Sequence, residues 1–348
     1  MRVLVGMSGG VDSSVAAARL VAAGHDVTGM YMQLSNADSF YKYGIDDDPQ
    51  DAAAVAAQLG IDFLLWDFAA EYQREVVEYF ASEYAAGRTP NPCLKCNRTI
   101  KFGQALDRAV AEGFDAFATG HYVQTSRAGG VTSLLRSRDL LKDQSYVLGV
   151  LNQWQLSHTI FPLGAETKAE VRAEAERLGL PTSSKKDSFD ICFIREGTSA
   201  QFLIDHLGVR PGAIVDESGA VLGSHDGAFQ FTVGQRRGLH LGHPAPDGAP
   251  RYVLSTDPAQ GTVTVGPHDH LRVDTINGHS LTFTESRRTE PWDGFAQWRA
   301  HSRPIPAHFS YSGDTLTATL AEPAFGIAPG QFLVCYDTNR VVGSAVIE

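Results

Sequence analysis

Short apolar runs alternate with alanine-rich segments of helical periodicity through the first 120 residues. Four runs rich in β-branched and aromatic side chains predict buried strands, at 2–7, 26–32, 61–68 and 114–120. Helical patterns stand among them at 12–23 and 51–59, and a glycine follows each. Strands that alternate with helices of this length indicate βαβ units and a parallel sheet, whose ligand would bind at the carboxyl ends of the strands.

The pattern changes twice further along the chain. From 151 to about 207 it is mainly helical, and Thr167 and Glu170 have the spacing of a capping box. After 208, turn sequences such as DESGAV and YSGDT separate short alternating runs, which is typical of β structure. A chain of 348 residues also exceeds the roughly 250–300 residues at which a single core stops growing. We therefore expect an α/β domain with a parallel sheet at 1–207, a small mixed or β domain at 208–275, and a β-barrel-like domain at 276–348.

The charge balance counts against a simple nucleic-acid binder. The formal net charge is −11, whereas phosphate binding normally leaves a basic footprint. One segment is nevertheless locally basic, because five Lys or Arg residues and only one acidic residue lie between 88 and 108. No apolar run approaches the ~18 residues of a membrane helix, so we expect a cytoplasmic protein with no membrane contact.

The sequence SGGVDSS at 8–14 stands between a predicted strand and a predicted helix, where a phosphate-binding loop belongs. Its glycines let the backbone approach phosphate oxygens closely, and its serines and the first helix amides supply donors. It lacks the lysine of a Walker A loop. The SGGxDS form resembles the loop of the ATP pyrophosphatases, which split ATP between its α and β phosphates and pass AMP to an oxygen of the substrate. By that resemblance Asp12 would help to hold Mg²⁺.

A CxxC pair, Cys93 and Cys96, lies in TPNPCLKCNRTIKFG at 89–103. A zinc site would normally need a second CxxC or paired histidines, and a thioredoxin-type pair would open a helix, whereas two prolines here indicate a longer loop. Four cysteines are too few for a disulfide scaffold and suit a reducing compartment. We expect Cys335, in the apolar run FLVCY, to be a core residue.

Several motifs in order along the chain resemble those of the tRNA-specific 2-thiouridylases. They are SGGVDSSVAA, NPCLKCNRTIKF, ATGHY, LLKDQSYVL, PLG, KKDSFDICF, FTVGQRRGL and PGQ. They span almost the whole chain. The resemblance implies an adenine nucleotide alpha hydrolase-like (PP-loop) fold for the first domain, followed by the two β domains.

The resemblance also implies roles at single positions. Cys96 matches the nucleophilic cysteine, and Cys192 matches the cysteine that carries a persulfide. The residues that would bind ATP are Gly6, Met7, Ser8, Gly9, Gly10, Val11, Asp12, Ser13, Met32 and Gly120. Those that would contact tRNA are Asn91, Pro92, Cys93, His121, Asp143, Gln144, Ser145, Arg299, Ala300 and Gln331. Arg299 and Ala300 match only loosely.

Cys93 departs from the family pattern, because some members carry an aspartate there with an acid/base role. Three thiolates, Cys93, Cys96 and Cys192, could hold a [4Fe–4S] cluster with one iron open to bind sulfide. A persulfide relay between Cys192 and Cys96 and a structural zinc are the alternatives. All three interpretations remain open at the level of the sequence.

Adenylation followed by sulfur transfer is the chemistry that this resemblance implies. The C2 oxygen of a wobble uridine would attack the α phosphate of ATP, and AMP would become the group that sulfur expels. Glutamate, glutamine and lysine tRNAs would be the substrates, and a cysteine desulfurase or a sulfur carrier would supply sulfur. Two other functions fit the phosphate loop: an ATP pyrophosphatase that amidates a small molecule, and an adenine-nucleotide sensor without turnover.

Overall fold

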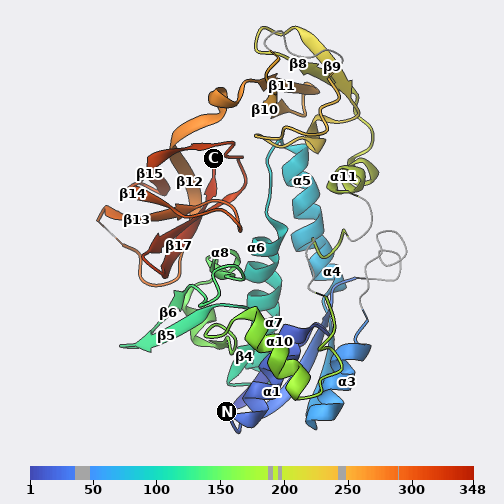
Figure 1. The fold of residues 1–348 in the computed structure, drawn as a ribbon, viewed down its shortest axis with the longest axis vertical. Helices are drawn as coiled ribbons and strands as arrows, with labels where there is room; N and C mark the ends of the chain where they lie inside the picture. The colour runs from blue at the N-terminus through green and yellow to red at the C-terminus, as the bar shows by residue number, and fades with distance from the viewer. Residues whose placement is uncertain (36–47, 187–190, 195–197, 242–247, 289) are drawn as a thin grey trace.

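A computed structural model describes the chain except for residues 36–47, 187–190, 195–197, 242–247 and 289. Figure 1 shows a parallel sheet with its helices at one end, a small sheet at the opposite end, and a barrel at the side. Among the described residues, no helix is long and apolar enough to cross a membrane. The expected fold class is confirmed by these three sheets.

The parallel sheet has the strand order β3-β2-β1-β4-β7. Its strands are β1 (Arg2–Gly6), β2 (Asp26–Gln33), β3 (Asp62–Asp67), β4 (Ala116–Ala118) and β7 (Thr159–Ile160). Leu4 belongs to one core cluster, whereas Val3 and Val5 belong to another. Alternate residues of β1 therefore face two separate cores, so this central strand is buried on both faces and carries a continuous apolar run.

Two long helical stretches of this part each change to π-helical turns partway along. The first comprises α4 (Ala69–Tyr72), the π-helical η1 (Gln73–Glu78) and α5 (Tyr79–Ala85). The second comprises α6 (Pro92–Cys96), the π-helical η2 (Asn97–Gln104) and α7 (Ala105–Ala111). The CxxC pair therefore lies on a helix, and our expectation of a loop was wrong.

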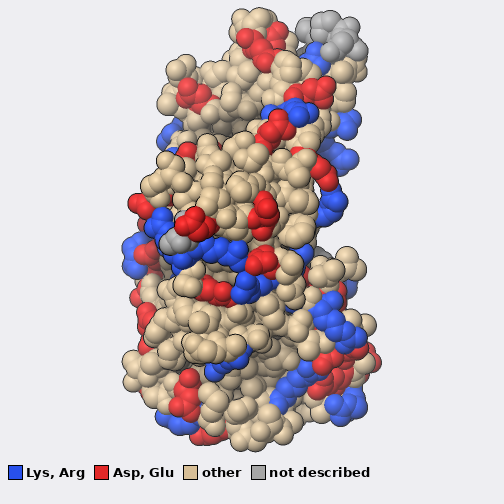
Figure 2. Space-filling model, turned by 90° about the vertical axis from the view of Figure 1, so that its left-hand side faces the viewer, with Lys and Arg blue, Asp and Glu red and all other residues tan. Residues whose placement is uncertain are grey.

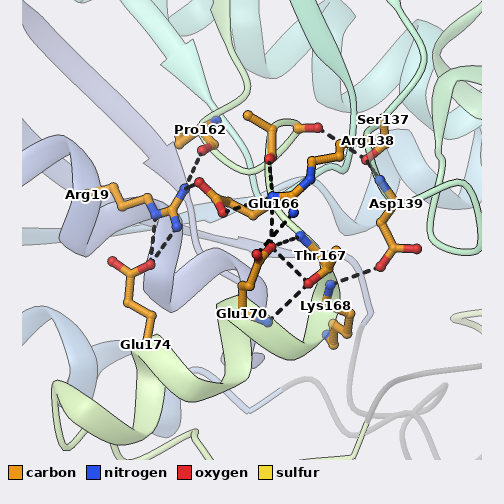
Figure 3. Close-up of polar contacts among 12 residues, drawn as sticks. Arg19, Ser137, Arg138, Asp139, Pro162, Glu166, Thr167, Lys168, Glu170 and Glu174 are labelled. Carbon is orange, nitrogen blue, oxygen red and sulfur yellow. Dashed lines mark hydrogen bonds and ion pairs between the residues drawn. The ribbon is translucent and has the colours of Figure 1, made fainter.

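The remaining helices include α1 (Val11–Ala22), α3 (Gln50–Leu59), α8 (Ser145–Leu148), α9 (Gln153–Ser157), α10 (Lys168–Arg177) and α11 (Ser199–Leu207). The capping box of Thr167 and Glu170 is present at the start of α10. Figure 3 shows how Arg19 of α1 joins this helix through Glu174, with 2.6 Å between guanidinium and carboxylate. This link holds α10 beside α1.

The small sheet has the order β10-β11-β8-β9. Its strands are β8 (Gly212–Val215), β9 (Val221–His225), β10 (Tyr252–Asp257) and β11 (Thr262–Gly266), with the short 3₁₀ helix η3 (Ala228–Gln230) beside them. β8 and β11 run parallel, and the other two pairs run antiparallel. The sheet is thus mixed, as expected.

The third sheet closes into a six-stranded barrel. A 3₁₀ turn, η4 (His268–Leu271), precedes β12 (Arg272–Phe283), β13 (Trp292–Gln297), β14 (Ile305–Ser312), β15 (Thr315–Phe325), β16 (Phe332–Asp337) and β17 (Arg340–Ile347). Pairing of β12 with β17 completes the circle, and Cys335 is buried in its core as expected. The hairpin β5 (Gln124–Ala128) and β6 (Val131–Leu135) extends the sheet from the first part of the chain. Residue 275, where we placed a boundary, lies inside β12.

Residues 87–91, the junction segment, lead into α6 and are held by both β regions. The Thr89 amide donates to the Pro329 carbonyl at 2.7 Å, and the Gln331 side chain donates to the Thr89 carbonyl at 2.9 Å. On the other side, the Thr256 hydroxyl donates to the Gly87 carbonyl at 3.4 Å. The helix that carries the CxxC pair therefore begins from a point fixed by all three parts of the fold.

Gly330 makes this contact possible. Its φ is +88°, and an added Cβ would lie 2.9 Å from the Arg88 Cβ. Gly330→Ala should therefore lower the free energy of unfolding by about 3 kcal/mol, from backbone strain plus overlap. The control Gly313→Ala, at φ +62° with open space around it, should lose only about 1 kcal/mol. Urea unfolding measures both values, and equal losses would contradict the tight contact at the junction segment.

Candidate active site

The phosphate loop lies between β1 and α1, at the carboxyl end of the sheet. Gly9 has φ +68°, and the N-cap Gly10 leaves the first amides of α1 without a side-chain cap. The Ser13 hydroxyl accepts from the Ser8 amide at 3.2 Å and donates to the Gly10 carbonyl at 3.1 Å. A glycine-lined turn with helix amides available at its end is suited to an anion. The loop therefore fits the phosphates of ATP.

Three strand ends surround this loop. Gly6, Met32 and Gly120, all expected near the nucleotide, come from β1, β2 and the end of β4. A Cβ at Gly120 would lie only 2.8 Å from the Ser13 backbone nitrogen. Glycine at 120 thus allows the chain beyond β4 to pass directly over the start of α1.

Asp12 is bonded to two side chains that we did not predict. The Lys168 ammonium donates to both carboxylate oxygens at 2.7 and 2.8 Å, and the Tyr122 hydroxyl donates to one of them at 2.8 Å. Lys168 is the first residue of α10 and lies inside the capping box, directly after its N-cap Thr167. The Asp12 carboxylate is therefore already paired with one cation in this structure.

A second ammonium reaches the loop from the KKDSFDICF motif. Lys185 forms an ion pair with Asp51, and its Nζ lies 3.8 Å from the position of a Cβ built on Gly9. Lys168 and Lys185 thus place two positive charges beside a loop that already offers backbone donors. Residues 187–190 of the same motif lie outside the described part of the chain.

The two cysteines of the CxxC pair lie on α6, Cys93 in its first turn and Cys96 at its end. Asn91 caps this helix, because its side chain accepts from the amides of Cys93 and Leu94 at 3.2 and 3.3 Å. Pro92 follows at the first helical position, where a missing N–H costs nothing. Cys93 is exposed and Cys96, one turn later, is buried. Asn91 and Pro92, expected to face the target base, therefore shape the helix that carries both thiols.

Cys192 joins this pair from nearly a hundred residues further along the chain. Its neighbour Phe193 is buried against the rings of Phe80 and Phe202, with ring centroids 5.3 and 5.2 Å apart. The Cys192 Sγ is exposed and lies 2.7 Å from the Tyr72 hydroxyl. An aromatic anchor therefore holds an otherwise exposed thiol in place.

The three thiols lie within electrostatic reach of one another. Burial raises the pKa of Cys96 to about 12, against the nearby Lys101, and the charges of Cys192 and Cys93 raise it further. Desolvation and the charge of Cys192 also raise the pKa of Cys93, again opposed by Lys101. All are free thiols. The structure thus brings together the three cysteines that the sequence singled out.

No metal site is preformed around these thiols. The described residues, which include every cysteine of the chain, contain no group of three or more His, Cys, Asp or Glu side chains placed to hold a metal ion. The residues present therefore do not fit a [4Fe–4S] cluster or a zinc ion in this arrangement.

Lys101 connects the thiols with the nucleotide end of the sheet. Besides its effect on Cys96, its charge contributes to lowering the pKa of His121, which burial brings to about 3. His121 directly follows Gly120, and its Nδ1 lies 2.8 Å from the Thr119 hydroxyl. His121 is therefore neutral at physiological pH and is bonded within the protein.

Most of the other residues expected to contact tRNA are bonded internally. The Asp143 carboxylate accepts from the Arg136 guanidinium at 2.8 Å, and Ser145 is fully buried. The Gln144 side chain accepts from the Tyr122 amide at 2.8 Å, so it positions the tyrosine that bonds to Asp12. These three side chains support the site in the structure described.

The expected contacts in the barrel lie near the junction segment. Gln331 donates to Thr89, as described above. The exposed Arg299 donates to the Gly326 carbonyl at 2.6 Å, and the adjacent Ala300 packs against the large core cluster.

Comparison with known proteins covers the whole chain. Three family models match: a tRNA methyl transferase HUP domain at residues 1–196, a tRNA methyl transferase PRC-barrel domain at 200–267, and an aminomethyltransferase beta-barrel domain at 272–347. Curated relatives called tRNA-specific 2-thiouridylase MnmA are similar over 100% of this chain. That of Acidothermus cellulolyticus is 52% identical, with 97% of the relative covered, and that of Streptomyces coelicolor is 51% identical, with 94% covered.

Solved structures resemble the chain more distantly. The U34-tRNA thiolase NcsA from Methanococcus maripaludis is 20% identical, over 56% of this chain and 62% of that one, with a TM-score of 0.34.

The HUP-domain sheet, its phosphate loop and the two β domains define a nucleotide-binding enzyme of the HUP class. With relatives 51–52% identical over its full length, the chain belongs to the family of tRNA-specific 2-thiouridylases.

The burial of the thiols predicts the order in which they react with iodoacetamide in the folded protein. The exposed Cys93 and Cys192 should be alkylated first. Cys96 should react slowly at pH 7, and its rate should rise about tenfold per pH unit up to pH 10, because the thiolate is the reactive form and the pKa of Cys96 is about 12. Cys335 should react only after unfolding. Peptide mass spectrometry measures each site, and rapid labelling of Cys335 in native buffer would contradict this order.

Proposed function

We propose that this protein adenylates the C2 oxygen of the wobble uridine of tRNA and replaces it with sulfur to form 2-thiouridine. The observation that carries the proposal is the arrangement of three free thiols on the same fold as an anion-binding loop, with Lys101 near Cys93 and Cys96. An ATP pyrophosphatase that uses ammonia has no need of these thiols, and neither has a nucleotide sensor. The names of the family models mention methyl transfer, which likewise gives the thiols no role.

Adenylation is the first step. The C2 oxygen attacks the α phosphate of ATP, and the bond to pyrophosphate breaks. Negative charge then grows on the phosphates, beside the amides of α1 and the ammonium groups of Lys168 and Lys185. The Asp12 carboxylate would hold the Mg²⁺ that accompanies ATP, and its present partner Lys168 would then be released toward the phosphates.

Sulfur transfer is the second step, and we propose the persulfide relay for it. Cys192 carries one additional sulfur, the outer sulfur, bonded to its Sγ. The outer sulfur attacks C2 of the adenylated base and AMP leaves. The Cys96 thiolate then attacks Sγ, the bond between Sγ and the outer sulfur breaks, and its electron pair stays with the sulfur on C2. The pyrimidine takes up a proton, and a Cys96–Cys192 disulfide remains for a cellular thiol to reduce.

The relay requires the Cys96 thiol to lose its proton, although burial raises the pKa of this thiol. Lys101 is the cation that lowers the pKa of Cys96. An incoming tRNA phosphate that paired with Lys101 would weaken this effect, so we propose that Lys101 stays beside the thiols during the reaction.

We further propose that tRNA lies across the junction segment, so that a flipped wobble base reaches Cys93 and Cys96. The exposed Arg236 and Arg237 follow Thr232, whose hydroxyl lies 3.4 Å from that of Thr89. On the side shown in Figure 2, basic side chains lie among acidic ones, with a short basic band at mid-height. Local basic groups of this kind could contact phosphates although the protein is acidic.

The cellular setting follows from this reaction. We propose that the protein acts in the cytoplasm on glutamate, glutamine and lysine tRNAs. A cysteine desulfurase or a sulfur carrier would load Cys192, which is exposed and can be approached from solvent.

The two lysines at the loop can be tested separately from the thiols. With ATP, Mg²⁺ and cognate tRNA, the protein should release AMP and pyrophosphate, and Lys168→Ala should lower pyrophosphate release by about 100-fold, as for loss of one transition-state donor. Lys185→Ala should show a loss in the same direction. The matched control Lys186→Ala, at an exposed neighbour, should keep normal activity. Release of ADP and phosphate would contradict the assignment.

Cys93 distinguishes the relay from the cluster. In the relay, Cys93→Ser should retain thiouridine formation to within about tenfold, because the two sulfurs that carry the reaction remain. Protein purified without oxygen should contain no iron, and a Cys192 persulfide should be detectable by mass spectrometry. Simultaneous loss of iron and activity in Cys93→Ser would instead establish the cluster. Cys192→Ala should form no thiouridine and still release pyrophosphate.

A further inference from the structure

Tyr72 is a polar side chain that contacts the sulfur of Cys192. It is only 2% exposed, and its hydroxyl lies 2.7 Å from the Cys192 Sγ. Burial and the charges of all three cysteines raise its pKa, with Cys192 contributing most among the cysteines. Tyr72 belongs to none of the motifs that carry the family resemblance. It is nevertheless the residue on which the influence of the three thiols converges.

The helix that carries Tyr72 and the helix that carries Cys96 share an unusual feature. The π-helical η1 begins at Gln73, directly after Tyr72, and the π-helical η2 begins at Asn97, directly after Cys96. π-helical turns are rare and occur frequently at functional sites. Each helix thus departs from α geometry immediately after the residue that it presents to the sulfur site.

Aromatic packing fixes both partners of the hydrogen bond. The Tyr72 ring meets Phe193 edge-on at 6.2 Å, and Phe193 in turn packs against Phe80. A phenol keeps its proton at neutral pH, since its ordinary pKa is about 10. Whenever the Cys192 Sγ carries no proton, as a thiolate or within a persulfide, Tyr72 is therefore the donor.

We propose that Tyr72 is a positioning residue, which holds the Cys192 Sγ through its O–H while the outer sulfur is transferred. This inference rests on the proposed thiouridylase function and adds a residue to it. When the Cys96 thiolate attacks Sγ, a new S–S bond forms as the bond to the outer sulfur breaks. Both events occur at the one atom that Tyr72 holds, so a displaced Sγ would leave the base bonded to Cys192 through the outer sulfur and no thiouridine would be released.

Tyr72→Phe in the full-length protein tests this role. With ATP, cognate tRNA and Cys192 loaded by a cysteine desulfurase and cysteine, pyrophosphate release should stay within about twofold of the unaltered protein. The ratio of thiouridine formed to pyrophosphate released should fall by about tenfold or more, as for loss of a hydrogen bond to a charged group. The control Tyr79→Phe, on α5 under the ammonium of Lys95, should leave the ratio unchanged.

Two further measurements separate positioning from general loss of structure. The Cys96–Cys192 disulfide should form more slowly in Tyr72→Phe under a mild oxidant, while thermal unfolding stays close to that of the unaltered protein. Phe193→Leu, which loosens Cys192 without removing the phenol, should lower the same ratio. An unchanged ratio in Tyr72→Phe would overturn the role of Tyr72. If Tyr72→Phe does not fold, an unchanged ratio in Phe193→Leu would overturn it. Failure of the unaltered protein to release pyrophosphate would instead reject the proposed function.

Discussion

The hydrogen bonds that hold the junction segment between the two β regions determine where the reactive thiols lie. Thr89 is bonded through its amide and its carbonyl to residues 329 and 331 of the barrel, and Gly87 accepts from Thr256 of the small sheet. Two residues after Thr89, Asn91 caps the helix that carries both CxxC cysteines. Movement of either β region would therefore move Cys93 and Cys96 relative to the phosphate loop. The β regions therefore help to position the CxxC helix relative to the catalytic sheet.

A second set of contacts ties the predicted tRNA positions to the nucleotide loop. Gln144 holds Tyr122, and Tyr122 donates to Asp12. A ligand that rearranged the segment of Gln144 would thus change the partners of Asp12, next to Lys168. Tyr122 thus connects a residue expected to touch RNA with the phosphate loop through two hydrogen bonds.

Much of the fold could be predicted because its signals are local. The strand run at 2–7, the capping box at Thr167 and the phosphate loop at 8–14 each depend on neighbouring residues, and the structure has each element within one or two positions of its prediction. The CxxC helix was missed because two nearby prolines are typical of a loop. Proline at the first helical position, where Pro92 lies, instead favours a helix. Asn91 before it was the cap signal that could have shown this.

The contacts made by side chains far apart in the sequence could not be predicted in the same way. Lys168 reaches Asp12 across 156 positions, and Tyr72 reaches Cys192 across 120. No local motif identifies either partner, because each partner is set by how the chain folds back. The role of the three cysteines came from family resemblance, and their proximity came from the structure.

The central claim is that AMP is attached to the C2 oxygen of uridine before sulfur arrives. The most direct test uses cognate tRNA with ¹⁸O at C2 of the wobble uridine and measures the mass of the released AMP. Because the bond between C2 and oxygen breaks when sulfur enters, the account predicts one ¹⁸O atom in AMP for each thiouridine formed. Unlabelled AMP accompanying thiouridine would contradict it.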